Sequence, residues 1–479
     1  MFTRIVIAVL ILAAPLAAAG PFDRVRTVIA EGLREENVAS IAVAVGRDGK
    51  IVWEEGFGWA DREKRIAATE HTMYSLASIS KPVTATGLMI LKHRGQLDLD
   101  RPVNDYLGDA KLMGRAGDAR LATVRRVANH TSGLPLHYQF FHEDEPDRPP
   151  PMDETIRRYG NLVTPPGEKY EYSNLGYGIL GYVVERLSGG AYEDFLREEV
   201  FLPLGLTRTS SGIGPRQESH HAVRYGADGL PIPFYDFDHR AASAIYSSAH
   251  DLVRFGMFHL KARLADQRQI LPDSIIDEMQ KPTTFGPGYG VGWNIVDRGG
   301  RRVVSHSGGM AGVVTLLSLY PEHNTAIVVL ANSRTNLVSR VQEAIVEALL
   351  APLAPRPAAG SPPAPEPLPG PLAGEWRGSV HTYAGEREIV LKFLPSGDVH
   401  ARLGTQLWTL LNDARISNGY LTGRFRGDIG TGDAARRPYV LSVSLKQRGD
   451  VLNGAVTALS VPGRRAGNAL THWAELKKQ

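Results

Sequence analysis

A cluster of prolines divides this chain into two parts. Between residues 351 and 371, nine positions are proline. Proline lacks an amide proton and favours an extended backbone, so such a segment does not pack as core and is typical of a semi-rigid linker. The sequence therefore predicts a large domain at residues 20–351, a linker at 352–371 and a smaller domain at 372–479.

The first 19 residues have the three-part pattern of a secretory signal peptide. Arg4 precedes an apolar run at residues 5–12, and small residues end the segment at Ala19. The apolar run is shorter than the ~20 residues that a membrane span needs, so cleavage is favoured over anchoring. We expect a mature protein that is periplasmic or secreted and that keeps no stable membrane span.

The composition excludes several classes of function. The 54 basic and 51 acidic residues nearly balance, and the basic ones are scattered, so we expect no nucleic-acid partner. The absence of cysteine excludes disulfides, thiolate metal sites and a thiol nucleophile. The central histidines match neither H-E-x-x-H nor a compact ligand cluster, so we expect loop or surface histidines and neither a metal nor another cofactor. These histidines are His137, His142, His220, His221 and His239.

The large domain has β-rich segments at both ends and helical patterns between them. A hairpin is predicted at residues 41–53 around the turn Asp48-Gly49, and helices are predicted at 78–94 and 336–350. Because strands occur at both ends, we expect an α/β region whose sheet unites distant parts of the chain. Three further β-rich runs lie at residues 303–307, 313–320 and 325–331.

The tail alternates short β-rich runs with turns that contain Gly and Asp. This spacing is typical of a small antiparallel barrel or sandwich. A small barrel fills its interior with side chains, so core positions are favoured over a ligand cup for Trp376, Trp408 and Trp473. The runs lie at residues 388–394, 406–411, 439–445 and 452–459.

Ser78 and Lys81 form the only S-x-x-K spacing in the chain. On a helix, residues i and i+3 share a face, so a deprotonated lysine amine can accept the serine proton. The apolar neighbours Leu76, Ile79 and Val83 predict a buried setting, and burial lowers the pKa of a lysine because it disfavours the ammonium. The four-residue pattern alone also fits a capping serine with a solvated lysine.

A second polar element is Tyr172-Ser173-Asn174. In an extended segment residues i and i+2 point the same way, so the phenol of Tyr172 and the carboxamide of Asn174 can face one cavity. A tyrosine near a lysine can take part in proton transfer with that lysine, and an asparagine can bind a substrate amide. An ordinary loop tyrosine with a turn-forming asparagine would give the same pattern.

A third element, His306-Ser307-Gly308-Gly309, ends a β-rich run. Two glycines let the backbone approach a substrate closely, and the amide of Gly309 can face a developing oxyanion. His306 fits either a hydrogen-bond donor to substrate or a structural core histidine.

In this order, the three elements resemble the serine β-lactamase and penicillin-binding-protein superfamily, in its class C branch. Residues 129–134, 246–252 and 290–293 also resemble segments of that family. The resemblance covers about residues 24–350 and implies an α/β fold, with a β-lactamase-like antiparallel sheet flanked by helices and an all-helical subdomain. The tail resembles the lipocalin-like C-terminal domains of some peptidase relatives.

The resemblance implies an acyl-enzyme mechanism. Ser78 would attack a carbonyl, with Lys81 and Tyr172 as a coupled general base. The backbone amides of Ser78 and Gly309 would form the oxyanion hole. The residues implied in substrate binding are Asn174, His306, Ser307 and Gly308.

One motif departs from the pattern of the β-lactamases. They usually have Lys-Thr-Gly where this chain has His306-Ser307-Gly308, which is more like D-aminopeptidases, D-peptidases and esterases. A histidine is mostly neutral at pH 7 and gives no fixed cation for a penicillin carboxylate. We therefore expect an exported serine hydrolase of a small-molecule or peptide substrate, with a cell-wall peptide as one candidate. A true β-lactamase and a non-catalytic sensor or binding protein remain alternatives.

Overall fold

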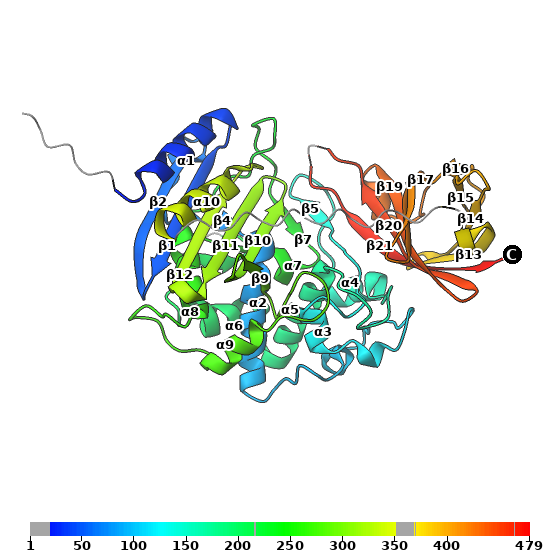
Figure 1. Ribbon diagram of the computed structural model, residues 1–479, viewed down its shortest axis with the longest axis horizontal. Helices are drawn as coiled ribbons and strands as arrows, with labels where there is room; N and C mark the ends of the chain where they lie inside the picture. The colour runs from blue at the N-terminus through cyan, green and yellow to red at the C-terminus, as the bar shows by residue number, and fades with distance from the viewer. Residues whose placement is uncertain (1–19, 215–216, 351–367, 369, 464) are drawn as a thin grey trace, which may run out of the picture.

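The computed structural model describes residues 20–214, 217–350, 368, 370–463 and 465–479, and it contains two large sheets (Figure 1). The predicted signal peptide and most of the predicted linker lie outside the described residues. Among the described helices, none combines the length and the apolar character that a bilayer crossing requires.

The seven-stranded sheet joins segments that are far apart in the sequence. Its order is β3-β2-β1-β12-β11-β10-β9, and all neighbours are antiparallel. At its centre Ile41 of β1 pairs with Ala331 of β12, so the predicted union of distant segments is confirmed. The predicted hairpin and the three later strands are confirmed as well. The strands are β1 (Ser40–Arg47), β2 (Lys50–Asp61), β3 (Ile66–Ala67), β9 (Asn294–Arg298), β10 (Arg301–Met310), β11 (Val313–Tyr320) and β12 (Thr325–Ala331).

Helices cover both faces of this sheet (Figure 1). On one face lie α1 (Asp23–Glu35) and α10 (Leu337–Leu349), and on the other lies α8 (Ala249–His259). Every residue of β12 is buried, because an apolar strand in the middle of a sheet covered on both sides contacts no water.

The second layer of helices surrounds α2 (Ser80–His93), which is buried along residues 80–91. The predicted helix at 78–94 therefore begins later, after the 3-10 turn Ala77–Ile79. The cause is Ala77, whose φ of 48° lies in the left-handed region and interrupts a regular helix. The other helices are α3 (Val124–Ala128), α4 (Met152–Tyr159), α5 (Asn174–Ser188), α6 (Tyr192–Leu196), α7 (Arg240–Ser243) and α9 (Asp273–Met279).

Short strands join parts of this layer. They form the pairs β4 (Tyr74–Ser75) with β8 (Ile245–Ser247), β6 (Thr209–Ser211) with β8, and β5 (Phe140–His142) with β7 (Tyr235–Phe237).

The tail is a nearly closed antiparallel barrel of nine strands, ordered β16-β15-β14-β13-β21-β20-β19-β18-β17. Its two edge strands are consecutive in the chain, separated by Leu411, and the Thr409 hydroxyl donates to the Arg426 carbonyl at 3.2 Å. Of the two predicted architectures, the barrel is therefore the one observed. The strands are β13 (Gly374–Thr382), β14 (Gly385–Phe393), β15 (Val399–Leu403), β16 (Thr409–Leu410), β17 (Asn412–Ser417), β18 (Tyr420–Phe425), β19 (Tyr439–Arg448), β20 (Val451–Ser460) and β21 (Ala469–Lys478).

The three tail tryptophans occupy different environments. Trp376 is buried in the barrel core, as predicted. Trp473 is also buried, but it packs against Val163 of the large domain. The core prediction is wrong for Trp408, which is 42% exposed because it lies beside the open edge, where the Arg402 guanidinium stands 4.9 Å from its ring.

The barrel contacts the large domain through backbone pairing. Tyr138 and Ala469 form an antiparallel bridge with N–H···O distances of 3.1 and 2.9 Å. Next to it, the Phe140 amide donates to the Asn468 side-chain oxygen at 2.9 Å. The segment before β21 is thereby fixed against the helical layer.

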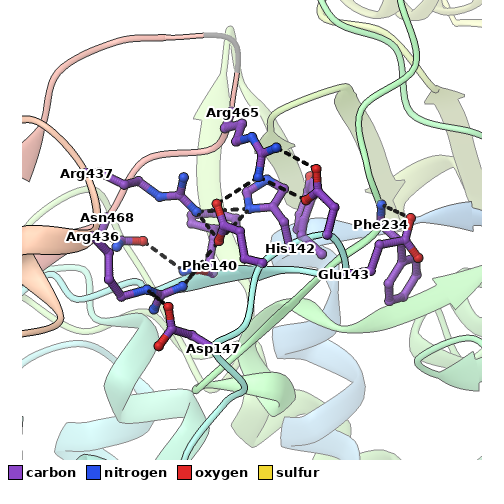
Figure 2. Close-up of polar contacts among 12 residues, drawn as sticks. Phe140, His142, Glu143, Asp147, Phe234, Arg436, Arg437, Arg465 and Asn468 are labelled. Atoms are coloured by element: carbon purple, nitrogen blue, oxygen red, sulfur yellow. Dashed lines mark hydrogen bonds and ion pairs between the residues drawn. The ribbon is translucent and has the colours of Figure 1, made fainter.

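Ion pairs surround this bridge (Figure 2). Glu145 accepts from Arg437 at 2.9 Å and from Arg465 at 2.8 Å, and only 19% of its side chain is exposed. Arg465 also donates to Asp144 at 2.5 Å. Burial alone raises the pKa of Glu145, but Arg437 and Arg465 hold that pKa below its usual value.

We expect Glu145→Gln to lower the free energy of unfolding by about 1–3 kcal/mol at pH 7, because it leaves the arginines without their shared carboxylate. A depressed carboxyl pKa stabilises the fold above the unfolded value of 4.5, and this stabilisation disappears as the pH falls through the folded value. Unfolding in urea at pH 7 and pH 3 should therefore show a difference between wild type and variant that shrinks at pH 3.

The matched control is Asp147→Asn. Asp147 pairs with Arg436 at 3.0 Å, but 49% of its side chain is exposed, so we expect a change below about 1 kcal/mol. Equal losses in the two variants would show that burial of Glu145 is unimportant for docking.

Candidate active site

The turn that carries Ser78 lies between the sheet and the helical layer. It packs on β10 and β11. At Gly308 of β10, a Cβ would lie 2.1 Å from the Leu76 carbonyl oxygen and 2.2 Å from Thr315 Oγ1. Such distances are impossible for real atoms, so glycine is required for β10 to approach the serine turn. The structure thus places Gly308 against Leu76 and Ala77, directly before Ser78, in a packing position.

Lys81 is fully buried, and its amine has three neighbours. Nζ lies 3.1 Å from Ser78 Oγ, 2.8 Å from Asn174 Oδ1 and 3.1 Å from the Ala242 carbonyl oxygen. Burial lowers the pKa of Lys81 well below its ordinary value of 10.5. In its neutral form the amine has two N–H groups, which donate hydrogen bonds to Asn174 Oδ1 and to the Ala242 carbonyl oxygen. The lone pair of this neutral amine is then directed at the Ser78 hydroxyl.

Tyr172 and Asn174 approach Lys81 from the start of α5. Ser173 caps this helix, since its hydroxyl accepts from the Gly176 amide at 3.0 Å. Asn174 is the first helical residue rather than part of an extended segment, yet both side chains reach the amine. The Tyr172 ring centroid lies 4.7 Å from Nζ. Burial raises the pKa of Tyr172, and a hydrogen bond with Ser78 partly opposes this rise.

These groups line a pocket of about 470 Å³ that both domains form. The large domain contributes Ser78, Tyr172, Asn174 and Gly309, among others. The barrel contributes residues 460–463 and 465–468, from the connection between β20 and β21, which we call the barrel loop. A Cβ at Gly309 would meet no atom within 4 Å, so the backbone here borders open space.

His306 is buried, does not line the pocket, and is neutral. Its Nδ1 lies 2.8 Å from the Ser307 carbonyl oxygen, which can only accept, so Nδ1 carries the proton. Nε2 then accepts from the Tyr289 hydroxyl at 2.8 Å. Burial and the nearby Lys81 lower the pKa of His306 to about 3. His306 therefore supplies no cation at neutral pH, whereas Ser307 is exposed.

An aromatic cluster that the sequence did not assign packs around this site. His130 lies 4.4 Å from Tyr172 and 4.6 Å from Tyr289, ring centroid to ring centroid. Its Nδ1 accepts from the Ser173 amide at 3.1 Å, which fixes the segment before α5. Their positions in the sequence could have indicated these two residues. His130 lies in the family-like segment 129–134, and Tyr289 directly precedes the segment 290–293.

The prediction of loop or surface histidines is wrong for His137, His142 and His239, which are at most 1% exposed. His137 and His239 both contact Asp238, and the ligand atoms of the three side chains lie within 4.8 Å of one another. The sequence could not reveal this cluster, because His137 and Asp238 are 101 positions apart. His239 also lines the pocket of Ser78.

A helix-covered antiparallel sheet, with a serine and a buried lysine in contact at its junction with a helical layer, defines the class of β-lactamase-fold serine hydrolases and penicillin-binding proteins. The sequence pattern of the Beta-lactamase family matches residues 25–351, and the chain belongs to this family.

Two curated relatives share this part of the chain. Penicillin-binding protein 4* of Bacillus subtilis (strain 168) is 27% identical over 357 residues, which cover 66% of this chain and 73% of that protein. Protein flp of Staphylococcus aureus (strain MRSA252) is 25% identical over 337 residues, which cover 67% of this chain. The match spans 65% of the length of protein flp, slightly less than two thirds.

Solved structures resemble the chain in fold. SurE matches with a TM-score of 0.65 and 24% identity, covering 94% of this chain and 99% of SurE. The octameric penicillin-binding protein homologue from Pyrococcus abyssi has a TM-score of 0.59 at 21% identity, covering 95% and 99%. The β-lactamase/D-alanine carboxypeptidase from Pseudomonas syringae has a TM-score of 0.59 at 19% identity, covering 69% and 99%. At these identities the likeness shows the fold alone.

The two neighbouring glycines of β10 give a matched pair of variants. We expect Gly308→Ala to lower the free energy of unfolding by about 2 kcal/mol or more, because the new methyl group meets the rigid backbone at Leu76. Gly309→Ala should change it by less than about 0.5 kcal/mol, because its methyl group enters open space. Urea unfolding measures both, and equal stability of the two variants would contradict the packing role of Gly308.

Proposed function

We propose that this protein is an exported serine hydrolase that forms an acyl-enzyme on Ser78 and hydrolyses a small peptide, amide or ester. The observation that carries this proposal is the environment of the Lys81 amine. Two acceptors occupy its N–H groups, and its lone pair faces the Ser78 hydroxyl at 3.1 Å. A neutral amine in this position is a general base for the serine.

In the first step the Ser78 Oγ attacks the substrate carbonyl carbon. Its proton moves to the base formed by Lys81 and Tyr172, which act as a coupled pair. The backbone amides of Ser78 and Gly309 stabilise the developing oxyanion. The base then gives the proton to the leaving amine or alcohol, and Asn174 holds the lysine and the substrate amide in place.

In the second step water attacks the acyl carbon, the bond to Ser78 Oγ breaks, and the product acid leaves. The proposed reaction needs no cofactor. The strand segment of His306, Ser307 and Gly308 contributes to substrate binding through the exposed Ser307, while the buried His306 and the packed Gly308 hold this segment beside the serine turn.

Substrates with a D-amino acid, or esters, are favoured over β-lactams. The neutral His306 provides no fixed cation for the carboxylate of a penicillin. The barrel loop limits the pocket to about 470 Å³, a volume that suits a small ligand. SurE, which shares both domains of the fold, has been crystallised with D-Leu, and another fold relative is a β-lactamase/D-alanine carboxypeptidase. A short D-amino-acid peptide of the cell wall therefore fits the proposal.

Export rests on the first 19 residues, with their basic, apolar and small-residue sections. A periplasmic or secreted location also agrees with a chain that has no cysteine to oxidise.

We expect intact-mass measurement to show a covalent adduct at Ser78 with p-nitrophenyl esters and D-alanyl amides. Ser78→Ala should form none, and its turnover should fall by about 10³-fold or more. Ser80→Ala is the control, because Ser80 is the buried first residue of α2, and its hydroxyl donates to the Ala77 carbonyl and accepts from the Ile245 amide rather than contacting the lysine amine.

The same intact-mass measurement also uses a cephalosporin as an acyl donor. Rapid decay of its adduct would support the alternative of a true β-lactamase. Adducts that never decay with any donor would support a binding or sensor protein instead.

The pH profile of acylation tests the role of Lys81. The amine is active only when neutral, so acylation should fall tenfold per pH unit below the lysine pKa and level off above it. Because burial lowers this pKa well below 10.5, the enzyme should keep its acylation rate at neutral pH. Stopped-flow release of p-nitrophenol between pH 5 and pH 10 measures the profile. A rate that rises up to pH 10 or beyond would contradict a lysine that is neutral at pH 7.

A further inference from the structure

A buried carboxylate lies between two imidazoles beside the pocket of Ser78. Asp238 Oδ2 is 2.6 Å from His137 Nε2, and Asp238 Oδ1 is 2.6 Å from His239 Nδ1. The three residues are at most 3% exposed. Of the three, only His239 lines the pocket. None of these three side chains has a role in the steps proposed so far for the hydrolysis through Ser78.

The hydrogen bonds fix the proton positions of His239. An ionised carboxylate only accepts, so His239 carries its proton on Nδ1 and keeps a lone pair on Nε2. Burial raises the pKa of Asp238, but its interactions with His137 and His239 outweigh this and hold the pKa below its usual range. Burial lowers the pKa of His239, so the ring is a neutral base at pH 7. Among the described residues none forms a hydrogen bond with Nε2, this atom is not completely enclosed, and His239 lines the pocket of Ser78.

His239 is held close to the groups around the serine. It precedes α7, whose Ala242 amide donates to the His239 carbonyl at 2.8 Å, while the Ala242 carbonyl accepts from Lys81. On its other side it packs on α5, where a Cβ at Gly178 would lie 3.1 Å from the His239 Cβ. Gly178 is one helical turn after Asn174, so the imidazole lies on the helical wall of the pocket.

The lysine is poorly placed to activate water. Its two N–H groups are held by Asn174 and Ala242, and its lone pair faces Ser78 Oγ. In the acyl-enzyme this oxygen is the ester oxygen, so the lysine faces the bond that breaks rather than the attacking water. A second base on the pocket wall would meet this need.

We propose that His239 is the general base for the hydrolytic water, oriented by Asp238 and His137; this inference rests on the proposed function. Nε2 takes a proton from water as the water oxygen bonds to the acyl carbon. The tetrahedral intermediate then collapses, the bond between carbon and Ser78 Oγ breaks, and the imidazolium returns the proton to Oγ. The products are the free acid and the original serine. Asp238 stabilises the transient imidazolium, as a carboxylate does beside a catalytic histidine.

The potential ligand atoms of the same three side chains lie within 4.8 Å of one another, which is close enough for them to bind one metal ion. Both imidazoles, however, already donate to Asp238 at 2.6 Å, and these bonds satisfy the carboxylate without an ion. Metal binding is therefore an alternative that the experiment must separate.

The test follows one turnover of a p-nitrophenyl ester by stopped flow and intact mass. In His239→Gln we expect the burst of acylation to stay within about threefold of wild type, and decay of the adduct to slow by about 10²–10⁴-fold. The adduct then accumulates on Ser78. Asp238→Asn should slow the same step, because the amide can donate to Nδ1 and so favours the wrong tautomer.

The matched control is His259→Gln. His259 is equally buried and bonds Thr86 at 2.9 Å, but it does not line the pocket, so both steps should keep their rates. Wild type gives a measurement that needs no variant. Decay of its adduct should fall at low pH as His239 becomes protonated, with a profile that differs from that of acylation.

Several results would overturn the inference. One is decay at the wild-type rate in His239→Gln, and another is identical pH profiles for the two steps in wild type. A third is loss of turnover on treatment with EDTA and its return with Zn²⁺, which would assign the three side chains to a metal. If the wild type itself forms no adduct, the proposed function fails, and this inference fails with it.

Discussion

The buried amine of Lys81 is the interaction on which the rest of the site depends. It connects the turn of Ser78, the start of α5 through Asn174, and α7 through the Ala242 carbonyl. Burial makes the ammonium unfavourable, and the two acceptors direct the remaining lone pair. The position of the amine and its protonation state therefore depend on each other, because any movement that exposed the amine to water would also restore its charge.

Much of the large domain could be predicted from local patterns. Alternation of apolar residues predicts the strands, and the spacing of Ser78 and Lys81 on one helical face predicts their contact. Such patterns act over a few residues. They could not show that Gly308 must pass beneath Leu76, or that His137 meets Asp238 across 101 positions, because both contacts arise from tertiary packing. A buried histidine and an exposed one look alike in sequence.

The barrel could be predicted as a unit, but its part in the site could not. Turn spacing predicts small β domains in general, whereas the barrel loop reaches the pocket only because Tyr138 and Ala469 pair and Arg465 binds Glu145. The Bacillus subtilis relative matches 66% of this chain, while SurE matches 94% in fold. The nucleophile and one wall of its pocket thus lie in different domains.

The central pairing of β1 with β12 also affects how the chain must assemble. Ile41 contacts Ala331 across 290 positions, the difference between 331 and 41. Closing so long a loop is entropically unfavourable and slows folding. Because β1 and β2 precede β12 in the chain, they are synthesised long before the strand that completes the centre of the sheet. Until β12 joins them, these apolar strands lack a partner, and unpaired strand edges make an incompletely folded chain prone to aggregation.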